Sequence, residues 1–267
     1  MSGKPLQSIT GRTNEHIKNA VRLRENAAQR RERSCLFLEG ARLVADAAAS
    51  SIAIRELFIT ESAMAKYAEL LHKAVNSAET VFVIAEHVAD ALSDTKSTQG
   101  VFGICIQRLV KPLDWCANAG YLALENVRDP GNTGTLLRTA EAFGLRGVIH
   151  SGCGDVYSPK VLRAGMGAQF RLPIWHTDNL PSLLREAAEN GVSTFAAVQD
   201  TDAEDVSGAF SGSAMVAIGN EGSGLTAQTI AACQKRVTIP MAGRAESLNA
   251  AAAGAIFCRE LVRQPGN

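Results

Sequence analysis

The sequence predicts an α/β protein built from two successive units in which strands and helices alternate. Short apolar runs such as CLFLEG and IRELFIT are separated by longer segments whose apolar residues recur at helical spacing. This alternation is typical of α/β folds with a largely parallel sheet. The chain has 267 residues, which is long enough for two domains of ordinary size.

Residues 1–108 are predicted to form the first domain. Its first element is a basic segment, RTNEHIKNAVRLRENAAQRRER, which is predicted to be one helix with Ile17, Val21 and either Leu23 or Arg24 near one face. Four apolar runs with helical segments between them follow. The predicted strands are Cys35–Gly40, Ile54–Thr60, Thr80–Ala85 and Gly100–Gln107.

Residues 109–119 are predicted to be a linker because they contain Lys-Pro and a polar tail. Residues 120–267 are then predicted to form a second α/β domain. Its last helix follows Ser-Leu-Asn and consists largely of alanine and other small residues. The predicted strands are Tyr121–Asn126, Arg146–Gly152, 172–176, 192–198, Ser213–Gly219 and 235–240.

Charge is distributed unevenly along the chain. The formal net charge is zero, but residues 1–33 carry eight Lys/Arg against three Glu. A basic helix is compatible with docking on nucleic-acid phosphates. The alternative is a solvated helix face whose arginine stems cover apolar surface. The segment alone favours neither interpretation.

The composition is that of an ordinary globular protein, with 46% hydrophobic and 20% charged residues. No apolar stretch approaches the roughly 20 residues that a transmembrane helix needs. The N-terminus MSGKPLQSIT lacks the apolar core of a signal peptide, so we expect a cytoplasmic protein.

The cysteines and histidines show no metal-ligand spacing. The six cysteines contain no C-x-x-C and do not cluster with the five histidines, so we expect free, buried thiols and no metal. A metal-dependent hydrolase is disfavoured for the same reason. His150 and Asp155 lie near the strand end at RGVIHSGCGD and are interpreted as loop residues.

Three polar, glycine-rich stretches each follow a predicted strand, which is where open parallel sheets bind ligands. The first, ENVRDPGNTGTLLRTAEAFG, places Asn132 at the start of a helix and Arg138, a potential anion ligand, six residues later. By itself this stretch is better explained by an Asn helix cap and an exposed Arg.

The second stretch, AIGNEGSGL, has glycines that free the backbone for close approach to a ligand, with Glu221 between them. It lacks Gly-Lys-Ser/Thr, which argues against a phosphate loop. It also lacks the G-x-G-x-x-G fingerprint, which argues against a nucleotide-dependent oxidoreductase. The third stretch, IPMAGRAESLNAAAAGAIF, places Ser247 and Asn249 at the mouth of the alanine-rich helix. Either residue alone could be a simple helix cap.

Together the three stretches resemble the motifs of the SpoU, or TrmH-type, RNA ribose 2′-O-methyltransferases of the SPOUT superfamily. The matching patterns are N-x-G-x-x-x-R-T-x-x-A-F-G from Asn132, G-N-E-G-x-G-L from Gly219 and I-P-M-x-G-x-x-x-S-L-N-x-x-x-A from Ile239. DTKSTQGVFGI, at Asp94–Ile104, resembles the end of the L30e-like RNA-binding domain that precedes many such catalytic domains.

The resemblance implies an L30e-like domain over 1–108 and a SPOUT domain with a deep trefoil knot over 120–267. Such knots are rare exceptions among protein topologies. The resemblance also implies S-adenosylmethionine (AdoMet) as cofactor and no metal. The implied cofactor-binding residues are Gly219, Ile239, Met241 and Leu248, which would act mostly through backbone atoms.

The implied reaction transfers the sulfonium methyl group to a ribose 2′-OH, which must lose its proton. The resemblance makes Arg138 the central catalytic residue, as a base or as an electrostatic stabiliser of the developing alkoxide. Asn132 would position Arg138 or the ribose, and Glu221 would hold the methionine end or orient Arg138. Ser247 and Asn249 would complete the pocket.

The implied partners are structured RNA, with ribosomal RNA favoured, and a second copy of the chain in a homodimer. A role in processing large-subunit (23S) rRNA is expected. A tRNA 2′-O-methyltransferase and a non-catalytic RNA-binding protein of the same fold are the alternatives.

Overall fold

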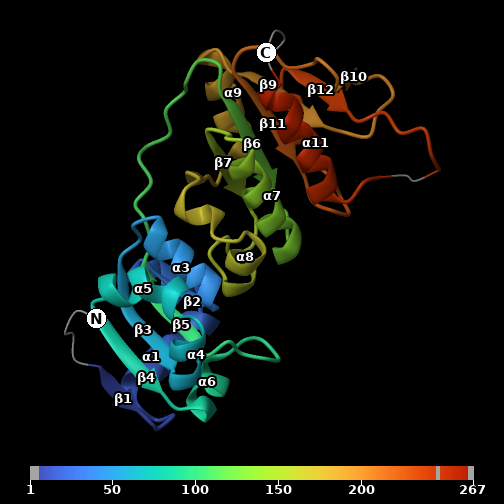
Figure 1. Ribbon diagram of the computed structural model, residues 1–267. Helices are drawn as coiled ribbons and strands as arrows, with labels where there is room; N and C mark the ends of the chain where they lie inside the picture. The colour runs from blue at the N-terminus through green and yellow to red at the C-terminus, as the bar shows by residue number, and fades with distance from the viewer. Residues whose placement is uncertain (1–5, 245–246, 264–267) are drawn as a thin grey trace. The chain divides into compact units, whose positions relative to one another are not determined.

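The computed structural model of the protein describes residues 6–244 and 247–263 (Figure 1). The chain forms two compact units. The first comprises the described residues up to Leu109 together with Tyr157–Phe170, and the second comprises Val110–Val156 with the described residues from Arg171 onward. The outer ends of the two predicted domains and Ala245–Glu246 of the third motif lie outside the described residues.

The first unit contains a five-stranded mixed sheet in the order β1-β4-β3-β5-β2. β4 pairs in parallel with β1 and β3, whereas β5 is antiparallel to both β2 and β3. The four predicted strands are confirmed, and β1 was not predicted. The strands are β1 (Gln7–Ile9), β2 (Cys35–Glu39), β3 (Ile54–Thr60), β4 (Thr80–Ile84) and β5 (Val101–Ile106).

Helices cover both faces of this sheet because successive strand side chains point to opposite faces. One core contains Phe37, Phe58 and Phe82 with Ile17 and other side chains of α1. The other contains strand residues with side chains of α3, α5 and the 157–170 segment. The helices are α1 (Glu15–Glu25), α2 (Ala27–Arg33), α3 (Ala41–Ala49), α4 (Glu61–Lys66), α5 (Ala68–Ser77), α6 (Glu86–Leu92) and α8 (Pro159–Ala164).

The basic segment is two helices, so the prediction of a single helix was wrong. The break falls at Asn26, whose side-chain oxygen accepts hydrogen bonds from the first backbone N–H groups of α2. Arg24 donates to the carbonyls of Ala91 and Ser93 at the end of α6, and the buried Arg30 donates to the carbonyl of Arg24 at the end of α1. These two arginines therefore cap helix ends, which favours a structural role for them over phosphate binding.

The second unit contains a seven-stranded sheet in the order β10-β12-β9-β11-β6-β7-β8, and every pairing in it is parallel. The predicted strands of this unit are confirmed with small shifts at their ends, and β10 was missed. The strands are β6 (Gly120–Glu125), β7 (Gly147–Ser151), β8 (Ile174–His176), β9 (Ser193–Ala197), β10 (Glu204–Asp205), β11 (Ala214–Ile218) and β12 (Lys235–Thr238).

The helices of this unit are α7 (Pro130–Ala142), α9 (Leu180–Glu189), α10 (Ala227–Ala232) and α11 (Ala250–Val262). α7 and α11 lie side by side (Figure 1). A Cβ atom on Gly254 of α11 would lie 2.1 Å from Leu136 Cδ2 of α7. The small residues of the last helix therefore allow close packing on α7, and this explains why the segment has so few large side chains.

The structure bears on two expectations from the sequence, free thiols and the lack of a membrane-spanning helix. All six cysteines are free, and Cys35, Cys105 and Cys258 are buried. Within residues 6–244 and 247–263, no helix combines the length and the apolar character required to span a membrane.

Candidate active site

The three motif stretches leave one edge of the seven-stranded sheet. β6, β11, β9 and β12 are neighbours, and all of their pairings are parallel. Their carboxyl ends therefore meet at the same edge, and the loops that follow them lie next to each other. This places the segments after Glu125, Ile218 and Thr238 together although they are far apart in the sequence.

A chain of side-chain hydrogen bonds joins the three stretches. The Asn132 amide donates to Glu221 Oε1 over 2.9 Å. The Asn249 amide in turn donates to Asn132 Oδ1 over 3.0 Å. Asn249 Oδ1 also accepts from Ala251 N over 2.9 Å, so the same residue caps α11. Asn132 thus has both ends of its amide group fixed by partners from the other two motifs.

Glu221 is held as a carboxylate by donors around it. The backbone N–H groups of Arg128 and Asp129 also point to its oxygens, over 3.4 and 3.3 Å. Partial burial by itself raises the pKa of Glu221, but the hydrogen bonds from Asn132 and the backbone outweigh it and leave the pKa below the ordinary value. The group is therefore an ionised acceptor at neutral pH.

The glycine turn after β11 is folded by Asn220. Its side-chain oxygen accepts from the N–H groups of Gly222 and Ser223 over 2.9 and 3.1 Å, and its amide donates to the carbonyl of Asn126 over 2.9 Å. The chain returns so closely that a Cβ on Gly219 would lie 2.1 Å from the carbonyl carbon of Gly224. Only glycine fits at this position.

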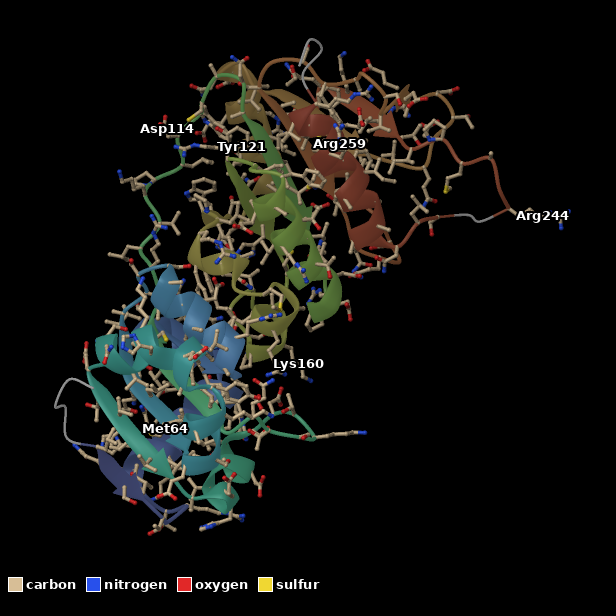
Figure 2. All side chains as sticks on the ribbon, viewed as in Figure 1. Met64, Asp114, Tyr121, Lys160, Arg244 and Arg259 are labelled. Atoms are coloured by element: carbon tan, nitrogen blue, oxygen red, sulfur yellow. The ribbon has the colours of Figure 1, made fainter. Side chains whose placement is uncertain are left out.

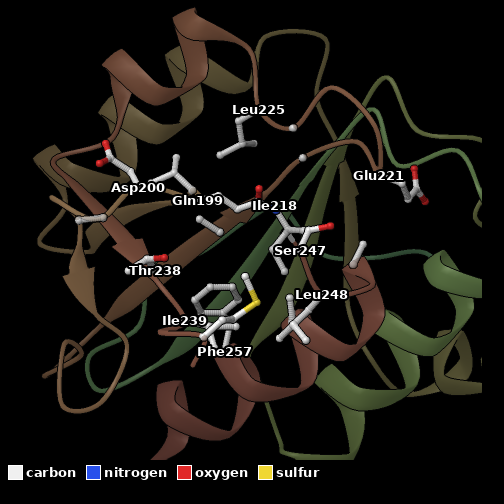
Figure 3. Close-up of a pocket in the computed structure, with 18 of the residues that line it drawn as sticks. Gln199, Asp200, Ile218, Glu221, Leu225, Thr238, Ile239, Ser247, Leu248 and Phe257 are labelled. Atoms are coloured by element: carbon white, nitrogen blue, oxygen red, sulfur yellow. The ribbon is translucent and has the colours of Figure 1, made fainter. Parts of the chain in front are cut away.

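A cavity of about 910 Å³ opens between the turn, the third motif and the loop after β9 (Figure 3). The middle of its wall is apolar, with Ile218, Leu225 and Phe257 among the lining residues. Its ionisable lining residues are Asp200, Asp205 and Glu221, and no Lys, Arg or His of the described chain contributes to the wall. The cavity thus suits a ligand with an apolar body and positive charge, and not a phosphate group.

Most of the residues predicted from the sequence converge here. The lining includes Gly219, Glu221, Ile239, Met241, Ser247 and Leu248. Asn132 and Asn249 do not line the cavity but are hydrogen-bonded in series to Glu221. Arg138 is exposed on α7 and is not among the residues that line the cavity, and within the described residues no hydrogen bond or ion pair holds its guanidinium group.

Several contributors were missed by sequence reasoning. Glu125, buried at the end of β6, accepts hydrogen bonds from Thr226 and Thr229 and so anchors the start of α10. The loop 198–205 after β9 lines the cavity, as does Phe257. The sequence does offer a signal for this loop, because the loop follows a predicted parallel strand and ligands bind at the carboxyl ends of such strands.

His150 belongs to strand β7, so its interpretation as a loop residue was wrong. Its ring stands edge-on to His176 with 5.2 Å between centroids. Burial lowers the pKa of His150 to about 4, with the neighbouring His176 acting in the same direction and Asp155 opposing it. His150 is not among the residues that line the cavity.

Comparisons with known proteins agree with this geometry. Residues 120–259 match the model of the SpoU rRNA Methylase family, and residues 14–103 match the MRM3-like substrate binding domain. The chain is 28% identical to the 23S rRNA (guanosine(2553)-2′-O)-methyltransferase RlmP of Bacillus subtilis, over 96% of this chain and 99% of that protein.

A second relative, the uncharacterized tRNA/rRNA methyltransferase slr1673 of Synechocystis, is 30% identical over 97% of this chain and 94% of its own length. Among solved structures, the AdoMet-bound rRNA methyltransferase from Sinorhizobium meliloti superposes with a TM-score of 0.80 and 31% identity, covering 96% of this chain and 97% of that one. The motif network, the parallel sheet and these matches establish that the chain belongs to the SpoU rRNA methylase family.

Proposed function

We propose that this AdoMet-dependent RNA methyltransferase methylates a ribose 2′-OH of 23S rRNA. The observation that carries the proposal is the hydrogen-bonded series Asn249–Asn132–Glu221, which joins all three motif stretches beside one cavity. The similarity to the 23S rRNA 2′-O-methyltransferase over nearly the whole of both chains supports the choice of RNA.

The residues of the cavity fit AdoMet. Its wall offers an apolar middle for the adenosine and carboxylates for the positive charges of the methionine end and the sulfonium. Gly219, Ile239, Met241 and Leu248 would hold the cofactor, and the absence of a Cβ at Gly219 lets the turn that lines the cavity close on the backbone of Gly224. Bound AdoMet supplies an electrophilic methyl group.

Arg138 is proposed to act at the ribose. It would act either as the base, after a substrate phosphate has taken up its proton, or as an electrostatic stabiliser of the negative charge that develops on the 2′-oxygen. Asn132 lies on the same helix, and the network fixes its amide for positioning the ribose or Arg138. Ser247 lines the cavity and completes the pocket, while Asn249 holds the start of α11.

The wider organisation follows the same proposal. Residues 1–108 would act as an L30e-like RNA-binding domain, 109–119 as a linker and 120–267 as a SPOUT domain with a trefoil knot. A homodimer is proposed as well, because the resemblance of the three motifs implies one. A protein that modifies ribosomal RNA would work in the cytoplasm.

The test compares Arg138→Ala with Arg185→Ala, an exposed arginine of α9 outside the cavity wall. Arg138→Ala is expected to abolish methyl transfer to unmodified 23S rRNA while AdoMet binding by calorimetry is retained, and Arg185→Ala should leave both unchanged. Near-normal turnover of Arg138→Ala refutes the role. Mapping 2′-O-methyl groups in rRNA and tRNA of cells with and without the gene decides between the two RNAs, and absence of AdoMet binding by the wild type favours a non-catalytic RNA-binding protein.

A further inference from the structure

A buried carboxylate organises one loop of the first unit. Glu39 ends β2 and is 5% exposed. Its oxygens accept hydrogen bonds from Ser93 Oγ over 2.5 Å, Thr95 Oγ1 over 2.8 Å and Asp94 N over 3.1 Å. Three consecutive residues at the start of the loop 93–99 are therefore attached to a single side chain.

Arg163 of α8 neutralises this carboxylate. Its Nη1 lies 3.0 Å from Glu39 Oε2, and its Nη2 lies 2.8 Å from Asp94 Oδ2. The Arg163 side chain is only 26% exposed, so the pair is screened less than a surface ion pair. Arg163 lies within the stretch that matches the methylase family model, yet α8 packs against β2 in the first unit.

Among the described residues, Lys96 of the loop 93–99 and Lys160 of α8 have no ion-pair partner. Asp94 is paired with Arg163, so Lys96 carries the remaining charge of the loop 93–99. Lys160, labelled in Figure 2, precedes Arg163 by three residues in α8, and residues three apart lie on the same side of a helix. Both lysines are exposed, and neither has a hydrogen bond or ion pair to any described residue.

We propose that Lys96 and Lys160 form a phosphate-binding patch for the RNA substrate, and that Arg163 is the positioning residue of this patch. The inference rests on the proposed function, because it assigns part of the RNA contact of that enzyme. RNA is the chosen partner since flexible, unpaired lysines bind phosphates as point charges, and no exposed aromatic or apolar group of the loop suggests a protein partner. The RNA surface of the first unit then includes a helix that the sequence places beyond β7.

The patch is tested by binding of an unmodified 23S rRNA transcript to the full-length protein across a range of KCl concentrations. The variants are Lys96→Ala, Lys160→Ala and the double variant. Lys73→Ala is the matched control, because Lys73 binds the carbonyl of Ala49 at the end of α3, the helix whose start follows β2. Each patch variant is expected to reduce the slope of log K against log salt by about 1, and the double variant to weaken binding about tenfold at moderate salt.

The outcomes separate the two proposals. If the wild-type protein binds no RNA, the proposed function itself is contradicted. Wild-type binding with patch variants that match Lys73→Ala in slope and affinity overturns the patch. Binding of AdoMet should be equal in the wild type and all four variants, and a loss of AdoMet binding in the patch variants also contradicts the inference.

The positioning role predicts a separation of kinetic constants. Arg163→Ala should raise KM for the transcript about tenfold while kcat at saturating RNA stays within twofold, and Arg163→Lys should restore part of the KM. Arg163→Ala also leaves the buried Glu39 carboxylate without its cation, so folding is checked by thermal unfolding. Adding Glu39→Gln to Arg163→Ala should recover the melting temperature but not the KM. Recovery of both, or a fall in kcat alone, overturns the positioning role.

Discussion

Asn249 performs two tasks that substitution can separate. Its side-chain oxygen caps α11, and its amide donates to Asn132 Oδ1 over 3.0 Å. Alanine removes both interactions. Aspartate keeps an oxygen for the cap and adds a charge that a helix N-terminus favours, but it has no N–H to donate to Asn132.

The magnitudes follow from the two interactions. Losing the cap costs about 1 kcal/mol, and losing the exposed hydrogen bond to Asn132 costs less than about 1 kcal/mol. Asn249→Ala is therefore expected to destabilise the protein by about 1–2 kcal/mol, or about 3–6 °C in Tm for a chain of this size. Asn249→Asp keeps the cap and loses only the hydrogen bond to Asn132, less than about 1 kcal/mol, so it should unfold closer to wild type than Asn249→Ala does.

The two variants, which should differ in Tm, should have the same affinity for AdoMet. In Asn249→Asp, a carboxylate faces the Asn132 oxygen, so the Asn132 amide must turn and release Glu221. Both variants are expected to bind AdoMet about tenfold more weakly, equivalent to about 1.4 kcal/mol. Tm is measured by calorimetry and affinity by titration. Wild-type affinity in Asn249→Asp, or wild-type Tm in Asn249→Ala, refutes the reasoning.

Two further predictions concern the glycine turn and the half-buried His150. Gly219→Ala should weaken AdoMet binding at least tenfold in the same titration, because its Cβ would lie 2.1 Å from the backbone of Gly224. Gly222→Ala, whose Cβ would meet nothing closer than 3.6 Å, should bind normally, and equal behaviour of the two contradicts the close-approach argument. Because the pKa of His150 is lowered to about 4 in the folded protein, this residue takes up a proton at a higher pH in the unfolded chain than in the folded one. The free energy of unfolding therefore falls as pH drops from about 6.5 to 4. His150→Gln should remove up to about 3 kcal/mol of that loss in denaturant titrations at the two pH values, and an unchanged pH profile contradicts the assignment.

The order of strands and helices was largely predictable because apolar runs and turn residues mark them locally. The breaks at Asn26 and Tyr67 were not, since both neighbouring segments have helical periodicity and the interruption depends on caps and packing. β1 and β10 were missed because strands of three and two residues leave no periodic pattern.

The candidate site was predictable to the extent that its residues lie in motifs. The motifs identify Asn132, Glu221 and Asn249 as site residues, and the structure joins these three by hydrogen bonds. The buried Glu125 was not selected, because its partners Thr226 and Thr229 lie about a hundred residues away along the chain and only the parallel pairing of β6 with β11 brings them close. The attachment of α8 to β2 through Arg163 has no local sequence signal either.

The wall of the cavity is completed by Ala250, Ala253 and Phe257, which belong to the last helix that the structure describes. A nascent chain whose last helix has not yet left the ribosome lacks this part of the cavity wall. It therefore has no complete binding site for the methyl donor. Recognition of the donor is thereby postponed until synthesis has passed Phe257. Donor present in the cell then favours the finished conformation over any incomplete one, by mass action.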